Sequence, residues 1–189
     1  MIEARVCDAV TVTAPPQTRR ALVQDAIVAK LRVVTDKRFA PNASGGCDLD
    51  AAAQAKGVTL GVFHNRWRDA DMLTLANKLT ADDRLGTIWR IHNRMNFNDP
   101  ATIEAGPIGG LLRDLGSHLV DQLLWLSGPA RQVDAQHDFV DLPAGRTDAS
   151  NTITLRHTSG VHLHISASKL NRCNLRVLRA YGDRGAYLS

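Results

Sequence analysis

A strand, a helix and a second strand follow one another near the start of the chain, and this order limits the fold more than any other feature. Residues 9–13 (AVTVT) are a mostly β-branched run that stops at the Ala-Pro-Pro of residues 14–16, which predicts a buried strand ending in a loop. Apolar residues at helical spacing follow over residues 18–30, and residues 31–35 (LRVVT) predict a second strand. Such a βαβ unit holds its two strands parallel and joins them by a right-handed crossover.

The α/β pattern continues to about residue 64. Residues 44–56 predict a helix that ends at Gly57, a typical capping residue, and residues 58–63 predict a third strand. We therefore expect residues 1–64 to form one domain and residues 65–189 to form a second.

The second half of the sequence has a different pattern. Residues 69–79 predict a helix, residues 87–92 alternate like a half-exposed strand, and residues 93–107 predict a loop rich in Asn, Asp, Gly and Pro. A central helix is expected over residues 111–126, followed by strand patterns joined by short turns, which are typical of an antiparallel sheet. These strand patterns cover residues 132–139, 150–156, 161–168 and 175–181. The expected fold class is thus an α/β domain followed by an α+β domain.

Composition excludes several classes of protein. The 189 residues are 44% hydrophobic and 22% charged, which is ordinary for a soluble globular protein with a real core. The net charge is only +4 and the arginines are scattered, so we expect no nucleic-acid partner. The three cysteines are far apart, which argues against a disulfide framework or a zinc site and fits a reducing cytoplasm. Because the sequence contains no long apolar run, we expect neither a leader peptide nor a membrane partner.

The residues most suggestive of chemistry lie between residues 109 and 121. A glycine pair opens the central helix, which carries Asp114 and His118 four residues apart and therefore on one face. Upstream, the second predicted strand runs into Lys37. A carboxylate that orients an imidazole, with a lysine beside them, would form a proton-transfer site. The alternative is an exposed helical ion pair and a solvated lysine, worth a few tenths of a kcal/mol at most.

Other candidates are weaker. His162 and His164 share one face of a predicted strand, but no third ligand is evident, so we expect no metal. The tryptophans are expected in the core rather than as stacking platforms, and they are Trp67, Trp89 and Trp125.

Four motifs in order give the chain a family resemblance. They are residues 13–18 (TAPPQT), 36–38 (DKR), 64–66 (HNR) and the stretch from Gly109-Gly110 to His118. With these motifs the chain resembles the Gfo/Idh/MocA family of NAD(P)-dependent oxidoreductases. The resemblance implies the C-terminal part of a Rossmann domain, followed by an open-faced, mainly antiparallel β-sheet domain with a packed central helix.

The resemblance also implies roles for residues. Lys37 would lie at the nicotinamide and contact the reacting oxygen of the substrate, His118 would be the acid/base, and Asp114 would hold the imidazole or a substrate hydroxyl. The cofactor, NAD or NADP, would be contacted by Thr13, Ala14, Pro15, Pro16, Asp36 and Lys37. A sugar, polyol or related substrate would be contacted by Asn65, Arg66, Asp114 and His118. A homo-oligomer formed through the sheet face is implied as well.

The sequence departs from the family in three places. Arg38 stands where the family has a proline that shapes the turn, so we expect Lys37 to be held less firmly. Trp67-Arg68 replaces an expected Arg-Trp pair. The glycine fingerprint G-x-G-x-x-G is absent, and the chain resembles the middle of an enzyme, truncated at both ends. The leading hypothesis is an oxidoreductase acting on CH–OH groups; the alternative is a non-catalytic truncated relative that only oligomerises or binds a partner.

Overall fold

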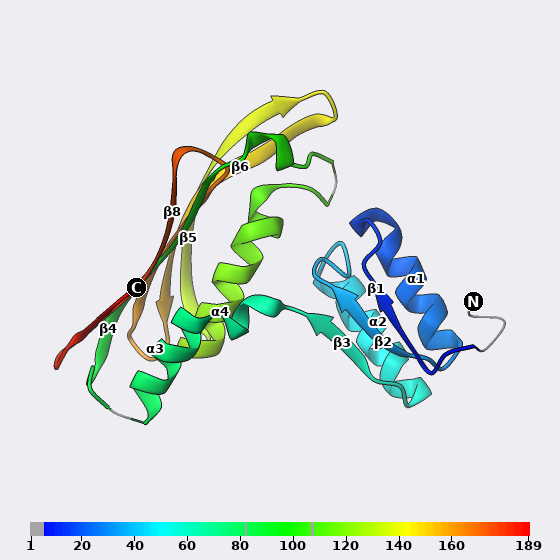
Figure 1. Cartoon of the computed structure of the whole chain (residues 1–189), viewed down its shortest axis with the longest axis horizontal. Coiled ribbons are helices and arrows are strands. Elements are labelled where there is room, and N and C mark those ends of the chain that lie inside the picture. The colour runs from blue at the N-terminus through cyan, green and yellow to red at the C-terminus, as the bar shows by residue number, and fades with distance from the viewer. Residues whose placement is uncertain (1–5, 82, 107) are drawn as a thin grey trace. The chain divides into compact units, whose positions relative to one another are not determined.

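A computed structural model describes residues 6–81, 83–106 and 108–189 (Figure 1). Two expectations fall on residues outside the described part: that of no leader peptide, at residues 1–5, and the last position of the loop expected over 93–107, residue 107. The chain divides into two compact units, the first ending at His64 and the second beginning at Asn65. Each unit has its own hydrophobic core.

In its described part, from residue 6 on, the first unit is a three-stranded parallel sheet with two helices. The strand order is β1-β2-β3, with both strand pairs parallel. The strands are β1 (Ala9–Val12), β2 (Arg32–Asp36) and β3 (Leu60–Phe63), and the helices are α1 (Pro16–Val28) and α2 (Ala43–Lys56). The predicted βαβ order and the parallel pairing are confirmed.

Local sequence explains where these helices begin and end. Pro16 occupies the first helical position of α1, where its missing N–H costs nothing, so the helix starts two residues earlier than the apolar spacing indicates. The side chain of Asn42 accepts a hydrogen bond from the Gly45 amide (2.9 Å) and caps α2. Gly57 ends α2 in the left-handed conformation, at φ 65°, as expected.

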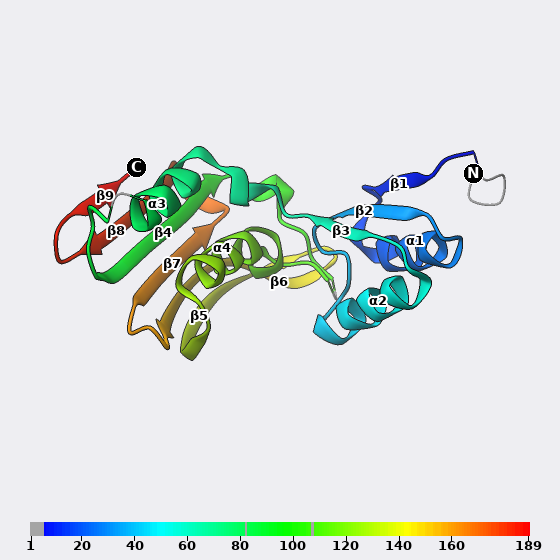
Figure 2. The same cartoon turned by 90° about the horizontal axis from the view of Figure 1, so that it is seen from below.

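Both helices of the first unit pack on one face of its sheet (Figure 2). Val23 and Ile27 of α1 and Leu49 of α2 are fully buried there against Val33 of β2. On the opposite face of the sheet, Val34 remains 44% exposed.

The second unit is a six-stranded sheet in the order β5-β6-β7-β4-β8-β9. Among the described strand pairs of this sheet, only the central β4–β7 pair is parallel, which confirms the expected mainly antiparallel sheet. The strands are β4 (Ile88–Asn98), β5 (Ala130–Leu142), β6 (Gly145–His157), β7 (His162–Ser168), β8 (Leu170–Gly182) and β9 (Ala186–Leu188). Its helical segments are η1 (Asn65–Arg68), α3 (Ala70–Thr80), η2 (Pro100–Thr102), the π-helical turn η3 (Leu112–Gly116) and α4 (Ser117–Ser127).

Helices α3 and α4 cover one face of this sheet (Figures 1 and 2). Leu119 and Leu123 of α4 are fully buried and belong to one core with Leu163 of β7 and Ile91 of β4. The opposite face is open, and Arg90, His164 and Arg179 are exposed there. The packed central helix and the open-faced sheet are therefore both present. No helix in the described part of the chain is long and apolar enough to cross a membrane.

The loop expected over residues 93–107 is wrong in its first part. Strand β4 continues to Asn98, and it lies between β7 and β8 rather than at an edge. Asn93 and Asn96 disfavour strands by composition, but both are buried in the structure, at 5% exposure each. Pairing on both sides of β4 overrides the local preference of these residues.

The prediction that the tryptophans are buried is also wrong. Trp67, Trp89 and Trp125 are 40%, 58% and 47% exposed. Trp125 follows the buried Leu123 by two positions and so lies on the outer side of α4, where its ring stacks on Trp67 at a centroid distance of 5.8 Å. The Trp67 indole donates a hydrogen bond to the Asp121 carboxylate.

One histidine on the open face of the sheet has a clearly altered acidity. The His92 ring on β4 lies edge-on to His164 of β7, at 4.9 Å between ring centroids, and to Tyr181 of β8, at 5.6 Å. Burial lowers the pKa of His92 from its usual 6.5, and positive charges lower it further. These charges belong to His164, Arg90, Arg179 and Arg94.

We expect His92 to make the fold acid-sensitive. Because its pKa is lower in the folded state, the unfolded state binds more protons, and stability is lost as the pH falls below about 6.5 toward the folded pKa. Urea unfolding at about pH 7.5 and about pH 5 should show a smaller loss of stability in His92→Gln than in the native chain. His162→Gln, on β7 of the same sheet, is the control and should keep the native loss. Equal losses of stability at the lower pH in the native chain and in His92→Gln would contradict the assignment of acid sensitivity to His92.

Candidate active site

The predicted cofactor-binding residues lie together at one edge of the first unit. Strands β1 and β2 are parallel, with Val12 opposite Thr35, so the loops that follow them leave the same edge of the sheet. The Ala-Pro-Pro loop follows β1, and Asp36 and Lys37 stand at the end of β2. Ligands of open parallel sheets bind outside the carboxyl ends of the strands, which is this edge.

Arg19, which the sequence did not single out, joins these two loops. It lies on the first turns of α1 and is only 4% exposed. Its guanidinium donates to the carbonyl oxygens of Ala14 (2.6 Å), Arg38 (3.2 Å) and Lys37. Its Nη2 also lies 3.8 Å from the Asp36 carboxylate. The signal that could have found it is an arginine at a position of α1 that faces the core.

The turn after β2 differs from the turn that a proline would make. The Lys37 amide donates to the Asp36 carboxylate at 2.7 Å, and Arg38 has a φ of 52°. Proline is fixed near φ −65°, so it could not occupy position 38 in this turn. The expectation that Arg38 merely loosens the turn overlooked the bonds from Arg19, which hold the carbonyls of both Lys37 and Arg38.

In the second unit, lack of space for a side chain explains the glycine pair at positions 109 and 110. A β-carbon on Gly109 would lie 2.5 Å from the Glu104 carbonyl oxygen. Gly110 has a φ of 95°, and a β-carbon there would lie 2.0 Å from the Asp148 carboxylate. Asp148 in turn accepts a hydrogen bond from the Leu112 amide at 2.7 Å. Gly109 therefore lets the chain pass close to the Glu104 carbonyl, and Gly110 lets it approach Asp148, which binds the Leu112 amide near the start of the central helix.

Asp114 lies in the π-helical turn that begins the central helix, and Lys169 binds it. The Asp114 carboxylate is 2.7 Å from Lys169 Nζ, which also donates to the Thr102 carbonyl at 2.8 Å. Lys169 stands between β7 and β8 and is only 8% exposed. Wide π turns are frequent at functional sites, where they change the direction of side chains. Sequence reasoning missed Lys169 because its partner is far away in the chain.

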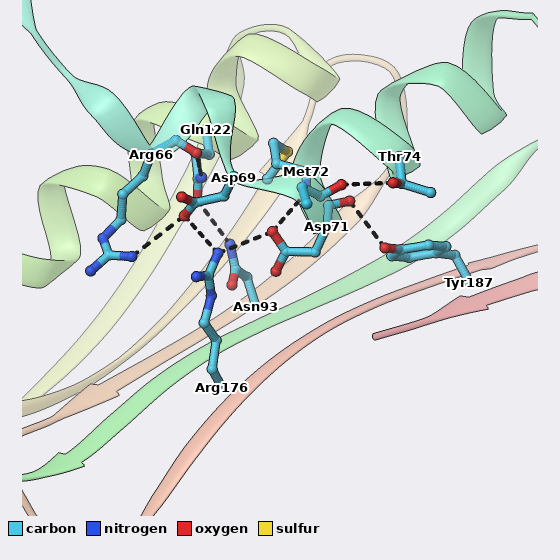
Figure 3. A network of polar contacts seen from close by, with 10 residues as sticks. Arg66, Asp69, Asp71, Met72, Thr74, Asn93, Gln122, Arg176 and Tyr187 are labelled. Atoms are coloured by element: carbon cyan, nitrogen blue, oxygen red, sulfur yellow. Dashed lines mark hydrogen bonds and ion pairs between the residues drawn. The ribbon is translucent and has the colours of Figure 1, made fainter.

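His118 is 4% exposed on the first turn of α4, one helical turn after Asp114. One turn further, Gln122 is 2% exposed. Its side chain donates to the Arg66 carbonyl and accepts from the side-chain amide of Asn93 at 3.4 Å (Figure 3). The face of α4 that carries His118 therefore also binds the segment that carries Asn65 and Arg66.

The Arg66 side chain is held as well. Its guanidinium lies 3.4 Å from the Asp69 carboxylate, which also binds Arg176 of β8 at 2.6 Å (Figure 3). Arg176 binds Asp71 at 3.0 Å. Asn65 is exposed. Of the predicted substrate residues, Arg66 is thus fixed to α3 and β8, and Asn65 is accessible.

Two groups of predicted residues result, one in each unit. Lys37 and Asp36 lie with the loop of residues 13–16, and Asp114 and His118 lie on consecutive turns with Arg66 tied to the same helix. That Lys37 joins Asp114 and His118 in one site stays a prediction.

Comparison with known proteins agrees with this architecture. The family model for the GFO/IDH/MocA C-terminal domain matches residues 73–188. The chain is 32% identical over 188 residues to the uncharacterized oxidoreductase YdgJ of Escherichia coli strain K12, covering 96% of this chain and 53% of YdgJ. It is 36% identical over 131 residues to the scyllo-inositol 2-dehydrogenase (NADP+) IolW of Bacillus subtilis strain 168, covering 67% of this chain and 36% of IolW.

A solved structure has the same fold over the whole chain. An oxidoreductase from Agrobacterium radiobacter, in complex with NAD+, L-tartaric acid and magnesium, aligns with a TM-score of 0.84 and 18% identity. The alignment covers 100% of this chain and 57% of that one. The chain belongs to the Gfo/Idh/MocA family of oxidoreductases. It spans about half the length of YdgJ.

Replacing Gly110 should disturb the start of the central helix. Gly110→Ala places a methyl group against Asp148 and forces alanine to a positive φ, so we expect a loss of about 2–4 kcal/mol in the free energy of unfolding. Gly160→Ala is the matched control, because Gly160 has a φ of 92° and open space around it. Urea unfolding of both variants isolates the contact with Asp148, and equal losses would show that this contact is unimportant.

The ion pair between Lys169 and Asp114 should contribute to stability. Lys169→Met leaves the Asp114 carboxylate without this partner, and we expect a loss of about 1–3 kcal/mol, since the carboxylate is partly exposed. The double variant with Asp114→Asn should lose less than the sum of the two single variants. Additive losses in a urea-unfolding cycle would mean that the pair is not coupled.

Proposed function

We propose that this chain forms part of an NAD(P)-dependent oxidoreductase that interconverts a hydroxyl and a carbonyl group on a polyol or sugar. The observation that carries the proposal is the buried His118, one turn after an aspartate held by a buried lysine, on the helix that also binds the Arg66 segment. The similarity to a protein named scyllo-inositol 2-dehydrogenase (NADP+) supports a cyclic polyol as substrate.

Part of the cofactor site would lie in the first unit. Its parallel strands end at an edge bearing Asp36 and Lys37, and nucleotides bind outside that edge in sheets of this class. We assign the binding of NAD or NADP to Thr13, Ala14, Pro15, Pro16, Asp36 and Lys37. The nicotinamide ring, when bound, supplies the hydride chemistry that protein side chains lack.

The proposed roles of the side chains follow from proton and charge movement. In the direction of oxidation, an imidazole nitrogen of His118 takes the proton from the reacting hydroxyl. The ammonium of Lys37 binds the same oxygen and stabilises negative charge that develops there. Asp114 orients the imidazole or a second hydroxyl, and Lys169 holds the Asp114 carboxylate in place. Arg66 and Asn65 contact the remaining hydroxyls.

Assembly and location belong to the same proposal. We propose that residues 1–64 serve the cofactor, that residues 65–189 serve substrate and assembly, and that copies of the chain associate through the open face of the sheet. The free thiols of Cys7, Cys47 and Cys173 support a reducing cytoplasm. The alternative, a non-catalytic relative, is not favoured, because a buried histidine and a lysine-bound aspartate are not needed for association alone.

Calorimetric titration of the 189-residue chain with NADH and with NADPH tests whether the chain binds either cofactor. We expect saturable micromolar binding, and a folded chain that binds neither nucleotide would contradict the assignment of cofactor binding to these residues of the first unit.

Measuring the activity of variants tests the roles proposed for His118 and Lys37. In an assay of NAD+- or NADP+-dependent oxidation of scyllo-inositol and other polyols, His118→Gln and Lys37→Met should each lower kcat by about 10²–10⁴-fold. Lys56→Met, at an exposed lysine in the last turn of α2, is the matched control for Lys37→Met and should keep native kcat. Native turnover by His118→Gln would remove its assigned role.

A further inference from the structure

We propose that Arg19 is a positioning residue, which ties the loop after β1 to the turn after β2 and so fixes where Lys37 is presented. The inference rests on the proposed function, in which Lys37 touches the reacting oxygen. The contacts that carry it lie entirely within the first unit.

The donors of the Arg19 guanidinium are matched by carbonyl acceptors around it. One nitrogen, Nη1, donates to two successive carbonyls, those of Lys37 and Arg38, while Nη2 donates to Ala14 on the other loop at 2.6 Å. Asp36 lies 3.8 Å from Nη2 and balances the charge. A buried cation is costly unless it is paired and hydrogen-bonded, and both conditions are met here. Only the planar fork of arginine presents enough donors in fixed directions to reach both loops.

The backbone of the turn is adapted to this arrangement. Arg38 has a φ of 52°, in the left-handed region that a non-glycine residue rarely occupies. This conformation persists only where surrounding contacts hold it. The bond from the Lys37 amide to Asp36 and the bonds from Arg19 to the two carbonyls are such contacts. Arg19 thus takes the place of a proline ring in fixing the turn.

The consequence for Lys37 is direct. Its carbonyl is held by Arg19 and its amide by Asp36, so its backbone is fixed on both sides. Loss of Arg19 releases the turn and moves the origin of the Lys37 side chain. A displacement of about 1 Å at a reacting group can lower the rate about 10²-fold.

Hydrogen–deuterium exchange of the 189-residue chain tests the contacts without any need for cofactor. In Arg19→Ala we expect amide exchange over residues 13–18 and 36–40 to rise about tenfold or more, with β3 and α2 unchanged. Arg19→Lys should give a smaller rise in amide exchange over the same residues. Arg20→Ala is the matched control and should exchange like the native chain, since the pair that Arg20 makes with Asp48, at 3.4 Å, is exposed to solvent.

Two variants of the turn sharpen the test. Arg38→Gly accepts the left-handed conformation and should keep native exchange, whereas Arg38→Pro cannot adopt it and should behave like Arg19→Ala. If Arg38→Pro keeps native exchange, or if Arg19→Ala raises exchange evenly through the first unit or not at all, the proposal is overturned.

Activity separates positioning from a structural role. Arg19→Ala should lower kcat about 10–100-fold when Lys37 is present, and far less in a Lys37→Met background, because its effect acts through Lys37. Equal losses in both backgrounds would contradict a positioning role. If the native chain shows no turnover, the proposed function fails, while the exchange experiment still decides whether Arg19 holds the two loops.

Discussion

The packing of α4 against the six-stranded sheet is the interaction on which the second unit depends. Leu119 and Leu123 are fully buried in its core, and each buried side chain of this size contributes about 1.5–3 kcal/mol. His118 and Gln122 precede them by one residue each and are buried on the same side of the helix. The hydrophobic contact that stabilises the domain therefore also fixes the direction of the candidate acid/base.

Burying polar groups beside this core requires partners for them. Gln122 bonds to the Arg66 carbonyl and to Asn93, which links α4 to η1 and to β4. Asp114, at the other end of the helical segment, is bound by Lys169 from the junction of β7 and β8. A rotation of the helix would break these bonds and expose leucines at the same time. The polar contacts thus specify one orientation of the helix, and the apolar contacts supply most of its stability.

How far the sequence predicts this structure depends on whether the relevant contacts are local. The βαβ unit, the cap at Gly57 and the central helix follow from periodicity and capping residues, which act within a few positions. Residues 93–98 and Trp125 were misjudged because their environment is set by strands and helices far away in sequence. Lys169 was missed for the same reason, since its partner Asp114 lies 55 positions earlier. The sequence indicated the glycine pair but not its cause, because the Glu104 carbonyl approaches Gly109 and the Asp148 carboxylate approaches Gly110 only in the folded chain.

Both candidate groups of residues share one device, a buried cation that binds main-chain carbonyls. Arg19 binds three carbonyls on two loops of the first unit, and Lys169 binds the Thr102 carbonyl and the Asp114 carboxylate in the second. The choice of residue follows from geometry, because arginine presents a planar fork of donors and lysine a single compact charge. Where several carbonyls on two loops converge, only the fork can satisfy them. Where one carboxylate is to be held beside one carbonyl, the ammonium is sufficient. Replacing Arg19 by lysine would therefore leave carbonyls unpaired, even though the charge is conserved.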